Sequence, residues 1–364
     1  MKNTFGTSLA VTIYGESHGP SVGVVLDGLA PGIPVDLAFV EHQLALRRPA
    51  DGLSTGRREP DPFVLESGVY KGRTTGTPLC IRIPNTVQHS DDYAFYGKAR
   101  PGHADYTAYT KYHGFEDPRG GGHFSGRITA GLVAGGAIAL TALKQKGILI
   151  GTHLSRCGGV NDRPFDDPKN DCPVLSEKAF PVLSDEAESA MKSAILAAKE
   201  AGDSVGGVLE TVVSGLPAGV GEPWFDTVEG VLSHGLFSVP AVKGVEFGDG
   251  FALADLRGSQ ANDPFRSEDG SIITSKNSNG GVNGGITNGM PLVFRCVIKP
   301  TPANFQAQPT VDFLTGENVD FTLSGRHDPC IAHRARVVID SVTALVIYDL
   351  LAGRFGTDWF AGER

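Results

Sequence analysis

The chain has 364 residues, of which 40% are hydrophobic and 20% charged, a composition typical of a folded globular protein rather than a disordered one. Its formal net charge of −9 argues against a general nucleic-acid binder, which needs a basic surface. The length allows one large or two medium domains, and no Pro/Ser-rich linker divides the sequence, so we expect one domain over residues 1–364.

The first half of the chain combines strand and helix signals. Residues 8–14 and 22–28 are apolar or alternating and predict two strands around a glycine-rich turn. Asp36 is a candidate N-cap for a helix that Pro49 ends. Residues 126–146 predict a largely buried helix, whose many small side chains permit close packing.

The second half continues in the same mixed way. The segment 157–182, rich in Pro, Asp and Gly, indicates a long irregular connection. The remaining expected elements are a helix capped by Ser184 and ended by Gly202, strands at 207–216 and 292–300, and a helix over 334–351. Because strands and helices do not alternate regularly, an α+β fold with antiparallel sheets is favoured over a doubly wound parallel sheet.

The cysteine spacing and the hydropathy indicate in which cellular compartment the protein works. The 5 cysteines are widely spaced with no CxxC pair, which argues against a disulfide framework or a zinc site and predicts reduced thiols. No other metal-binding pattern is present, so no metal is expected. The longest apolar run, Ala130–Leu143, is shorter than the roughly 20 residues of a membrane span. Glu16 precedes any signal-peptide core, so we expect a cytoplasmic protein with no membrane partner.

The segment Gly15–Gly19, GESHG, matches the G-x-S-x-G nucleophile elbow of α/β-hydrolases. That elbow needs several strands before the serine and a helix after it, whereas a strand pattern follows Pro20 here. A serine hydrolase is therefore disfavoured. His18 in this turn, like His103 in RPGHAD, is either a solvated side chain or half of a shared proton-handling site, because an imidazole exchanges protons near neutral pH.

Two glycine-rich stretches are candidate ligand loops. RGGGHFSGR at 119–127 precedes the predicted helix at 126–146, so its backbone N–H groups and the helix dipole suit an anion, although a plain tight turn is equally compatible. NGGVNGGI at 279–286 is either a close-approach loop or a mobile surface loop, and Lys299 follows at a strand end. Neither stretch is a dinucleotide or Walker A fingerprint.

Arginines gather in two places. Arg47, Arg48, Arg57 and Arg58 lie close together in sequence, and Arg326-His327-Asp328 is followed by Arg334 and Arg336. Arginine binds carboxylates and phosphates bidentately, so the clusters suggest a small polyanionic substrate, with scattered surface charge as the alternative.

Together these motifs resemble the chorismate synthase family. The resemblance rests on GESHG, RPGHADYT at 100–107, DPRGGGHFSGRITA at 117–130, GDSVGG at 202–207, AVKGVEFGDGF at 241–251 and GRHDPC at 325–330, in the family's order over residues 4–352. It implies a β–α–β sandwich with a helical layer between antiparallel sheets, assembled as a homotetramer. It also implies the last step of the shikimate pathway: a 1,4-anti elimination of phosphate from 5-enolpyruvylshikimate 3-phosphate that gives chorismate and requires reduced FMN without net redox change.

The resemblance also assigns roles. It implies that His18 protonates the departing phosphate, that His103 manages protonation near the flavin N1–C2=O region, and that Asp328 acts near flavin N5. Arg47, Arg48 and Arg57 are expected to bind substrate anions or the phosphates of the reductant. The expected flavin contacts are His123, Phe124, Ser125, Pro240, Ala241, Gly284, Lys299, Pro300, Thr301, Pro302, Ala303 and Arg326.

Three departures from the family pattern weaken single contacts. His123-Phe124 stands where the family often has Arg-Ser, Pro240 stands where it often has Asn, and the segment 49–57 is about one residue short. Because the sequence has no flavin-reductase domain and no dinucleotide fingerprint, we expect an external reductant. A non-catalytic flavin- or anion-binding protein remains the alternative. Such a protein would tolerate the loss of both His18 and His103 with no change in activity.

Overall fold

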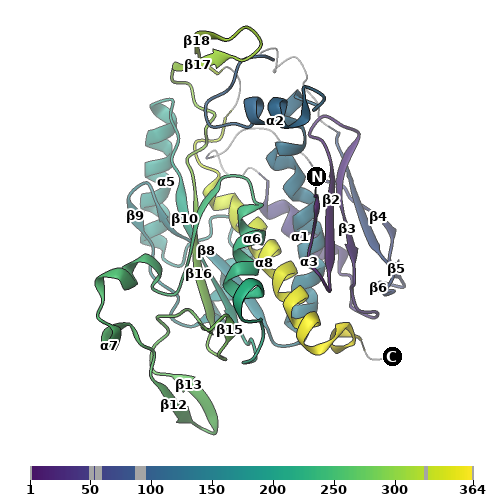
Figure 1. Ribbon diagram of the computed structural model, residues 1–364, viewed down its shortest axis with the longest axis vertical. Coiled ribbons are helices and arrows are strands. Elements are labelled where there is room, and N and C mark those ends of the chain that lie inside the picture. The colour runs from purple at the N-terminus through teal and green to yellow at the C-terminus, as the bar shows by residue number, and fades with distance from the viewer. Residues whose placement is uncertain (1, 49–52, 54–59, 87–95, 324–326, 363–364) are drawn as a thin grey trace.

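Two antiparallel sheets enclose a layer of helices (Figure 1). The computed structural model describes residues 2–48, 53, 60–86, 96–323 and 327–362. In this part of the chain one connected hydrophobic cluster joins both sheets to the helices between them. The predicted α+β class and the sandwich of sheet, helices and sheet are confirmed.

The N-terminal sheet has the strand order β1-β2-β3-β7-β4. Its strands are β1 (Thr4–Phe5), β2 (Ala10–Gly15), β3 (Ser21–Asp27), β4 (Val64–Ser67) and β7 (Leu79–Pro84). β2 and β3 pair from Ala10↔Asp27 to Gly15↔Val22, which confirms the two predicted strands and the turn between them. Beside this sheet lies the small pair β5 (Val69–Tyr70) and β6 (Arg73–Thr74).

The C-terminal sheet has the order β11-β16-β10-β8-β9. Its strands are β8 (Leu149–Cys157), β9 (Val160–Asn161), β10 (Gly207–Ser214), β11 (Val242–Phe247) and β16 (Leu292–Ile298). The predicted strands at 207–216 and 292–300 are therefore confirmed as β10 and β16, which are direct neighbours.

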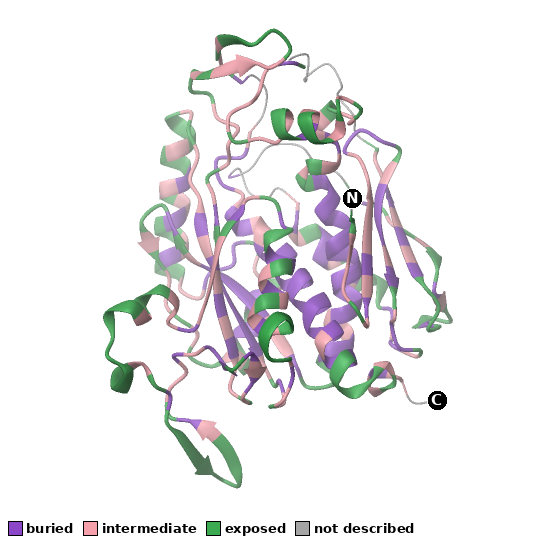
Figure 2. Cartoon of the chain, viewed as in Figure 1, coloured by how far each residue is buried: buried purple, intermediate pink, exposed green. Residues whose placement is uncertain are grey.

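The middle layer contains α1 (Leu37–Leu46), α3 (Thr129–Gln145), α6 (Val228–Phe237) and α8 (Ala332–Phe355). α3 and α8 are the most buried of these helices (Figure 2). They cross so closely that a Cβ added at Gly136 would lie 2.3 Å from the Cβ of Ser341, so a glycine is required at this contact. The small residues noted in the sequence thus serve the packing of the two central helices.

The segment Gly126–Gln145 is long and apolar enough to cross a membrane by length and composition. However, 83% of its most apolar window is buried inside the protein, between the two sheets. This is the arrangement of a core helix, and the hydropathy follows from burial on all sides of α3.

Several elements lie outside the two main layers. They are α2 (Asp105–Tyr112), α4 (Pro168–Glu177), α5 (Asp185–Glu200), α7 (Gly258–Ala261) and the hairpins β12–β13 (Phe265–Glu268, Ser271–Thr274), β14–β15 (Val282–Asn283, Ile286–Thr287) and β17–β18 (Gln308–Asp312, Glu317–Phe321). α5 begins as predicted, since Ser184 accepts a hydrogen bond from the Ala187 N–H. The prediction of an irregular connection over 157–182 is wrong, because this stretch contains β9 and α4.

A row of charged side chains crosses four strands of the C-terminal sheet. His153 on β8 contacts Asp162 (2.8 Å) and Glu210 on β10 (3.2 Å) through its two ring nitrogens. Arg295 on β16 continues the row to Glu210 (3.3 Å) and to Glu246 on β11 (2.8 Å). Burial opposes a charged imidazole, but the hydrogen bonds to both carboxylates outweigh it and raise the pKa of His153.

α8 also connects to the start of the chain. The Asp349 carboxylate accepts hydrogen bonds from the backbone N–H groups of Thr7 (3.0 Å), Ser8 (2.6 Å) and Leu9 (2.7 Å). Farther along, the Gly362 N–H donates to the Pro31 carbonyl at 3.0 Å. The N-terminal sheet is therefore held by a helix from the opposite end of the sequence.

Candidate active site

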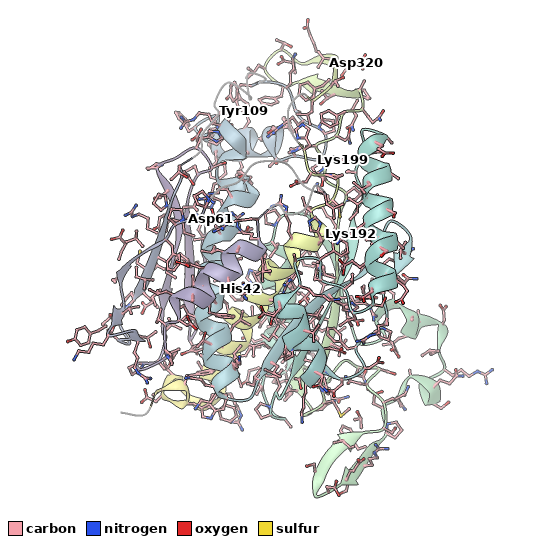
Figure 3. The ribbon with its side chains drawn as sticks, turned by 180° about the vertical axis from the view of Figure 1, so that it is seen from behind. His42, Asp61, Tyr109, Lys192, Lys199 and Asp320 are labelled. Carbon is pink, nitrogen blue, oxygen red and sulfur yellow. The ribbon has the colours of Figure 1, made fainter. Side chains whose placement is uncertain are left out.

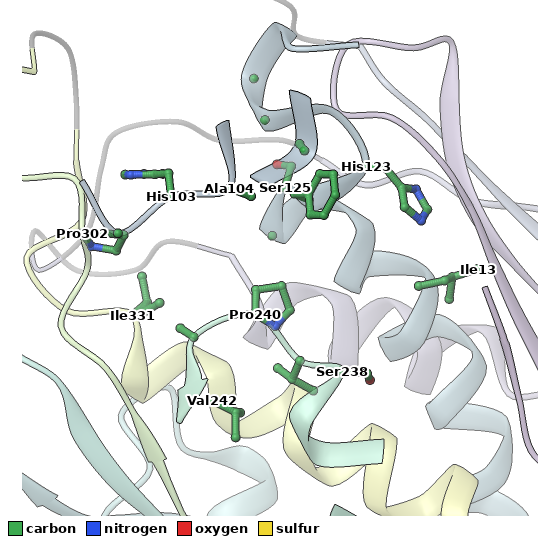
Figure 4. Close-up of a pocket in the computed structure, with 18 of the residues that line it drawn as sticks. Ile13, His103, Ala104, His123, Ser125, Ser238, Pro240, Val242, Pro302 and Ile331 are labelled. Carbon is green, nitrogen blue, oxygen red and sulfur yellow. The ribbon is translucent and has the colours of Figure 1, made fainter. Parts of the chain in front are cut away.

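A cavity of about 1370 Å³ opens at one end of the helical layer. Figure 4 shows His103 and His123 on opposite sides of it, with Pro240 below. The predicted site residues among its lining are His103, His123, Phe124, Ser125, Pro240, Ala241, Lys299, Thr301, Pro302, Ala303 and Asp328. Segments far apart in the sequence thus meet here, as the motifs predicted.

The lining of the cavity is basic although the whole chain is acidic. Among the described residues it has seven Lys or Arg side chains (Lys2, Lys98, Arg100, Arg119, Lys243, Lys299, Arg334) and four carboxylates (Asp105, Glu116, Asp117, Asp328). The excess of three positive charges contrasts with the net charge of −9 for the chain. An anionic ligand is therefore attracted to this cavity rather than to the remaining surface.

The loop before α2 fixes His103. Arg100 forms a bidentate pair with Asp105 at 2.7 and 2.8 Å, which closes the loop. His103 Nδ1 lies 3.1 Å from the Pro101 carbonyl, and because a carbonyl only accepts, Nδ1 carries the proton and Nε2 the lone pair. Burial, with the nearby charge of Arg100, lowers the pKa of His103 to about 4. His103 is therefore a neutral imidazole at neutral pH.

A second loop is bonded to the first. The Lys299 ammonium donates to the Gly102 carbonyl at 2.6 Å, and the Lys299 N–H donates to the Ala241 carbonyl at 3.0 Å. Ala241 has φ = 75°, a left-handed conformation that costs energy for any residue with a Cβ. Burial lowers the pKa of Lys299, and Lys243 lowers it further. Lys299 thus joins the three backbone segments that form this wall.

His18 lies behind the cavity wall with only 3% of its surface exposed. Gly120, which lines the cavity, covers it so closely that an added Cβ would lie 2.3 Å from the imidazole. A Cβ added at Gly122 would lie 2.0 Å from the carbonyl oxygen of Asp117. Both glycines have positive φ. The triple glycine therefore lets the backbone pass directly over His18.

The turn that carries His18 is a hairpin turn between β2 and β3. No helix follows Ser17, so the nucleophile elbow of a serine hydrolase is absent, as the sequence predicted. The Ser17 N–H donates to the Gly122 carbonyl at 3.0 Å. The His123 Nδ1–H donates to the Gly15 carbonyl at 2.7 Å, so the residue that departs from the family pattern supports this turn through its ring.

Asp328 and Arg334 belong to the cavity lining, whereas the predicted substrate-binding residues Arg47 and Arg48 do not. Asp328 is buried and ion-paired with Arg334, whose guanidinium also reaches the Arg47 carbonyl at 3.5 Å. Arg47 in turn pairs with Asp61 at 3.0 Å. Burial raises the pKa of Asp61, but the positive charges of Arg47 and Arg127 outweigh it, so the pKa lies below its usual value. The wall therefore continues inward as a cluster of arginines around one carboxylate.

Asp61, labelled in Figure 3, is the residue that these arginines surround. Its side chain is 0% exposed and is ion-paired with both Arg47 and Arg127, while Arg48 lies 3.9 Å away. Neither Asp61 nor Arg127 is among the residues that the sequence predicts for the site. Arg127 stood inside a recognised motif and could have been found there, whereas a single Asp between two prolines gives no pattern signal.

Not every predicted residue meets the cavity. Gly284 lies in the β14–β15 turn and Pro300 beside the Lys299 loop, and neither is part of the lining. Arg57 and Arg326 lie outside the described residues. Arg336, noted with the second arginine group, is buried and donates to the Lys178 carbonyl at 2.9 Å, which is a structural role.

His103 and His153 are expected to have opposite charge states at pH 7.5. Because both ring nitrogens of His153 face carboxylate oxygens, which accept hydrogen bonds, ring-nitrogen NMR should show both of them protonated. His103 should carry a proton on Nδ1 only and gain its second proton near pH 4. Since an unfolded histidine protonates near 6.5, His103 lowers the free energy of unfolding as the pH falls from about 6.5 to about 4. A His103→Gln sample identifies the signal, and a His103 that titrates near 6.5 would contradict the expectation.

Comparison with known proteins agrees with this geometry. The chorismate synthase family model matches residues 9–352. The chorismate synthase of Thermococcus kodakarensis is 44% identical over 355 residues, covering 96% of this chain and 97% of that protein. A chorismate synthase of Dehalococcoides mccartyi is 43% identical over 353 residues, covering 96% of each.

A solved structure described as a crystal structure of chorismate synthase superposes with a TM-score of 0.76 at 27% identity, covering 96% of this chain and 94% of that chain. The sequence matches and the fold thus extend over nearly the same residues as the motifs. The chain therefore belongs to the chorismate synthase family, a family of carbon–oxygen lyases.

Proposed function

We propose that the protein converts 5-enolpyruvylshikimate 3-phosphate to chorismate and inorganic phosphate by a 1,4-anti elimination, with reduced FMN held in the cavity. The observation that carries this proposal is the basic cavity of an acidic, family-matched chain, with His103 on its surface and His18 directly behind Gly120. The substrate has two carboxylates and a phosphate, and FMN adds another phosphate, so an excess of cations suits both molecules.

The residues present fit a flavin and a substrate together. Single ligand sites usually occupy about 300–1,000 Å³, and this cavity of about 1370 Å³ is larger. The Thr301 hydroxyl is buried, lines the cavity and has no hydrogen-bond partner among the described residues, so it is available to a ligand. Lys299 and Ala241 frame the same wall, and we assign this wall to the cofactor.

The chain's own groups are suited to moving two protons. Reduced FMN supplies electron density that helps phosphate leave, with no net redox change. We assign His18 as the acid that protonates the departing phosphate and His103, neutral with a free lone pair on Nε2, to proton control at the flavin. Asp328, held by Arg334, is the carboxylate assigned to the flavin N5 region, where it would help the flavin take the ring proton.

We also infer the surroundings of the reaction. The lack of a dinucleotide fingerprint favours an external flavin reductant over intrinsic reduction by NADPH. Unlinked buried thiols such as Cys157 and Cys330, whose Sγ atoms lie 3.9 Å apart, favour the reducing cytoplasm. Exposed aromatic side chains at Trp224, Phe225 and Phe251 favour assembly, and we expect the family's homotetramer.

The test is an anaerobic assay with purified protein, dithionite-reduced FMN and 5-enolpyruvylshikimate 3-phosphate, in which chorismate is followed by its ultraviolet absorbance. Chorismate is expected with pre-reduced flavin, and no chorismate is expected with oxidised FMN plus NADPH. Product in the NADPH sample would show intrinsic reduction and contradict the external reductant. No product in any sample, from folded protein that binds FMN, would leave only the binding-protein hypothesis.

A further inference from the structure

Asn85 directly follows β7 and lies against the turn that carries His18. Its side-chain Nδ2 donates to two carbonyls of that turn, Glu16 at 3.0 Å and Gly19 at 2.8 Å. Its backbone N–H donates to the Pro20 carbonyl at 3.1 Å. Among the described side chains, Asn85 is the one that bonds carbonyls on both sides of His18.

The orientation of this amide is fixed by its partners. The two carbonyls only accept, and the Arg127 Nε–H, 2.9 Å from Asn85 Oδ1, only donates. The NH₂ group must therefore face the turn and the oxygen must face Arg127. An aspartate at this position would keep the acceptor for Arg127 and replace both donors with an oxygen that faces two carbonyl oxygens.

Arg127 is itself held in place. Its guanidinium is ion-paired with the fully buried Asp61 and donates to the Pro84 carbonyl at 3.2 Å. The contacts thus form a continuous path from Asp61 through Arg127 and Asn85 to the turn. Two further bonds between described residues, from the His123 ring to the Gly15 carbonyl and from the Ser17 N–H to the Gly122 carbonyl, act on the first half of the turn.

We propose that Asn85 is a positioning residue for His18, which fixes the turn so that the imidazole lies under Gly120 at the cavity wall. The proposal rests on the proposed role of His18 as the acid that protonates phosphate. Asn85 does not line the cavity and contacts neither ligand in this scheme. Its effect on the reaction therefore passes entirely through His18.

The experiment is a double-mutant cycle on the full-length holoenzyme, with single-turnover chorismate formation as the readout. Asn85→Asp is expected to lower the rate by about 100-fold, because a displacement of about 1 Å in a catalytic group has an effect of that size. The KM for 5-enolpyruvylshikimate 3-phosphate and the affinity for reduced FMN should stay unchanged. In a His18→Ala background the same substitution should have no effect on the rate, since the group it positions is gone.

Asn85→Ala removes the donors without adding charge and serves as the second variant. Asn170→Asp is the matched control, because Asn170 is an exposed amide on α4 that donates to the Asp167 carboxylate and does not line the cavity. This variant is expected to keep full turnover. Equal losses for Asn85→Asp with and without His18 would overturn the proposal. Full turnover of both Asn85 variants would also overturn the proposal, and so would the failure of both variants to fold.

A failure of the proposed function gives a different result. In that case the unmodified protein makes no chorismate, or His18→Ala retains full turnover, before any Asn85 variant is compared. If the unmodified protein is active and His18→Ala is slow, the cycle reports only on Asn85.

Discussion

Replacing His18 with alanine is expected to lower the turnover number for chorismate formation by about 10²–10⁴-fold, the usual contribution of a positioned general acid. His18 is buried under Gly120, so alanine leaves the departing phosphate without this proton donor while the cavity wall keeps its lining. The KM for substrate and the binding of reduced FMN should change little. Anaerobic steady-state kinetics and a flavin titration measure both quantities.

His103→Ala is expected to slow turnover as well, with flavin still bound. His42→Ala is the control, because His42 lies on α1, contacts the Ser176 carbonyl at 3.0 Å and is not part of the cavity lining. If the His18 and His103 variants both kept full turnover, the assigned proton-transfer roles would be wrong. A non-catalytic binding protein would then be the better description.

Asp61→Ala is expected to lower the free energy of unfolding by about 3–5 kcal/mol, the usual cost of removing one partner from a buried ion pair. The side chain of Asp61 is fully buried between Arg47 and Arg127, whose charges would be left without this carboxylate. Denaturant unfolding, followed by circular dichroism at fixed protein concentration, measures the change.

Glu188→Ala provides the comparison for Asp61→Ala. Glu188 pairs with Lys192 one helical turn away on α5, where both side chains are partly exposed, so a loss of only about 0.3–0.5 kcal/mol is expected. If Asp61→Ala cost no more than Glu188→Ala, the buried cluster would not depend on its carboxylate. The path that leads from Asp61 toward Asn85 would then lose its anchor.

Local signals predicted most of the central elements. Asp36 and Ser184 both cap helices through the predicted hydrogen bonds, to the N–H groups of Phe39 and Ala187. The strands on either side of His18 followed from their apolar pattern. These predictions succeeded because caps and strand patterns depend on residues within a few positions of each other.

The missed helix α4 shows how similar local signals compete. Asp167 caps it through the Lys169 N–H, and Pro168 stands at its first position, which is a recognised helix start. Yet the same Asp-Pro pair, in a stretch rich in Gly and Asp, also indicates a turn. Packing against β8 decides in favour of the helix, and that contact cannot be read from the segment itself.

The motifs predicted which segments meet at the cavity but not how the site is supported. Asp61 and Asn85 act through partners far away in sequence, Arg127 above all, and neither stands in a characteristic pattern. The glycines at 120–122 were interpreted as a possible anion loop, whereas Gly120 makes room for the His18 ring. Such roles depend on the exact neighbours that the fold brings together.

The position of α8 has a consequence for folding during protein synthesis. This helix is the middle of the core, yet it follows every strand of the two main sheets in the sequence. The C-terminal sheet therefore leaves the ribosome before the helix that packs on its inner face, and the Asp349 contacts to residues 7–9 form later still. Nascent chains thus expose apolar sheet surface until α8 emerges, which makes the interval before its release the period of greatest need for chaperones.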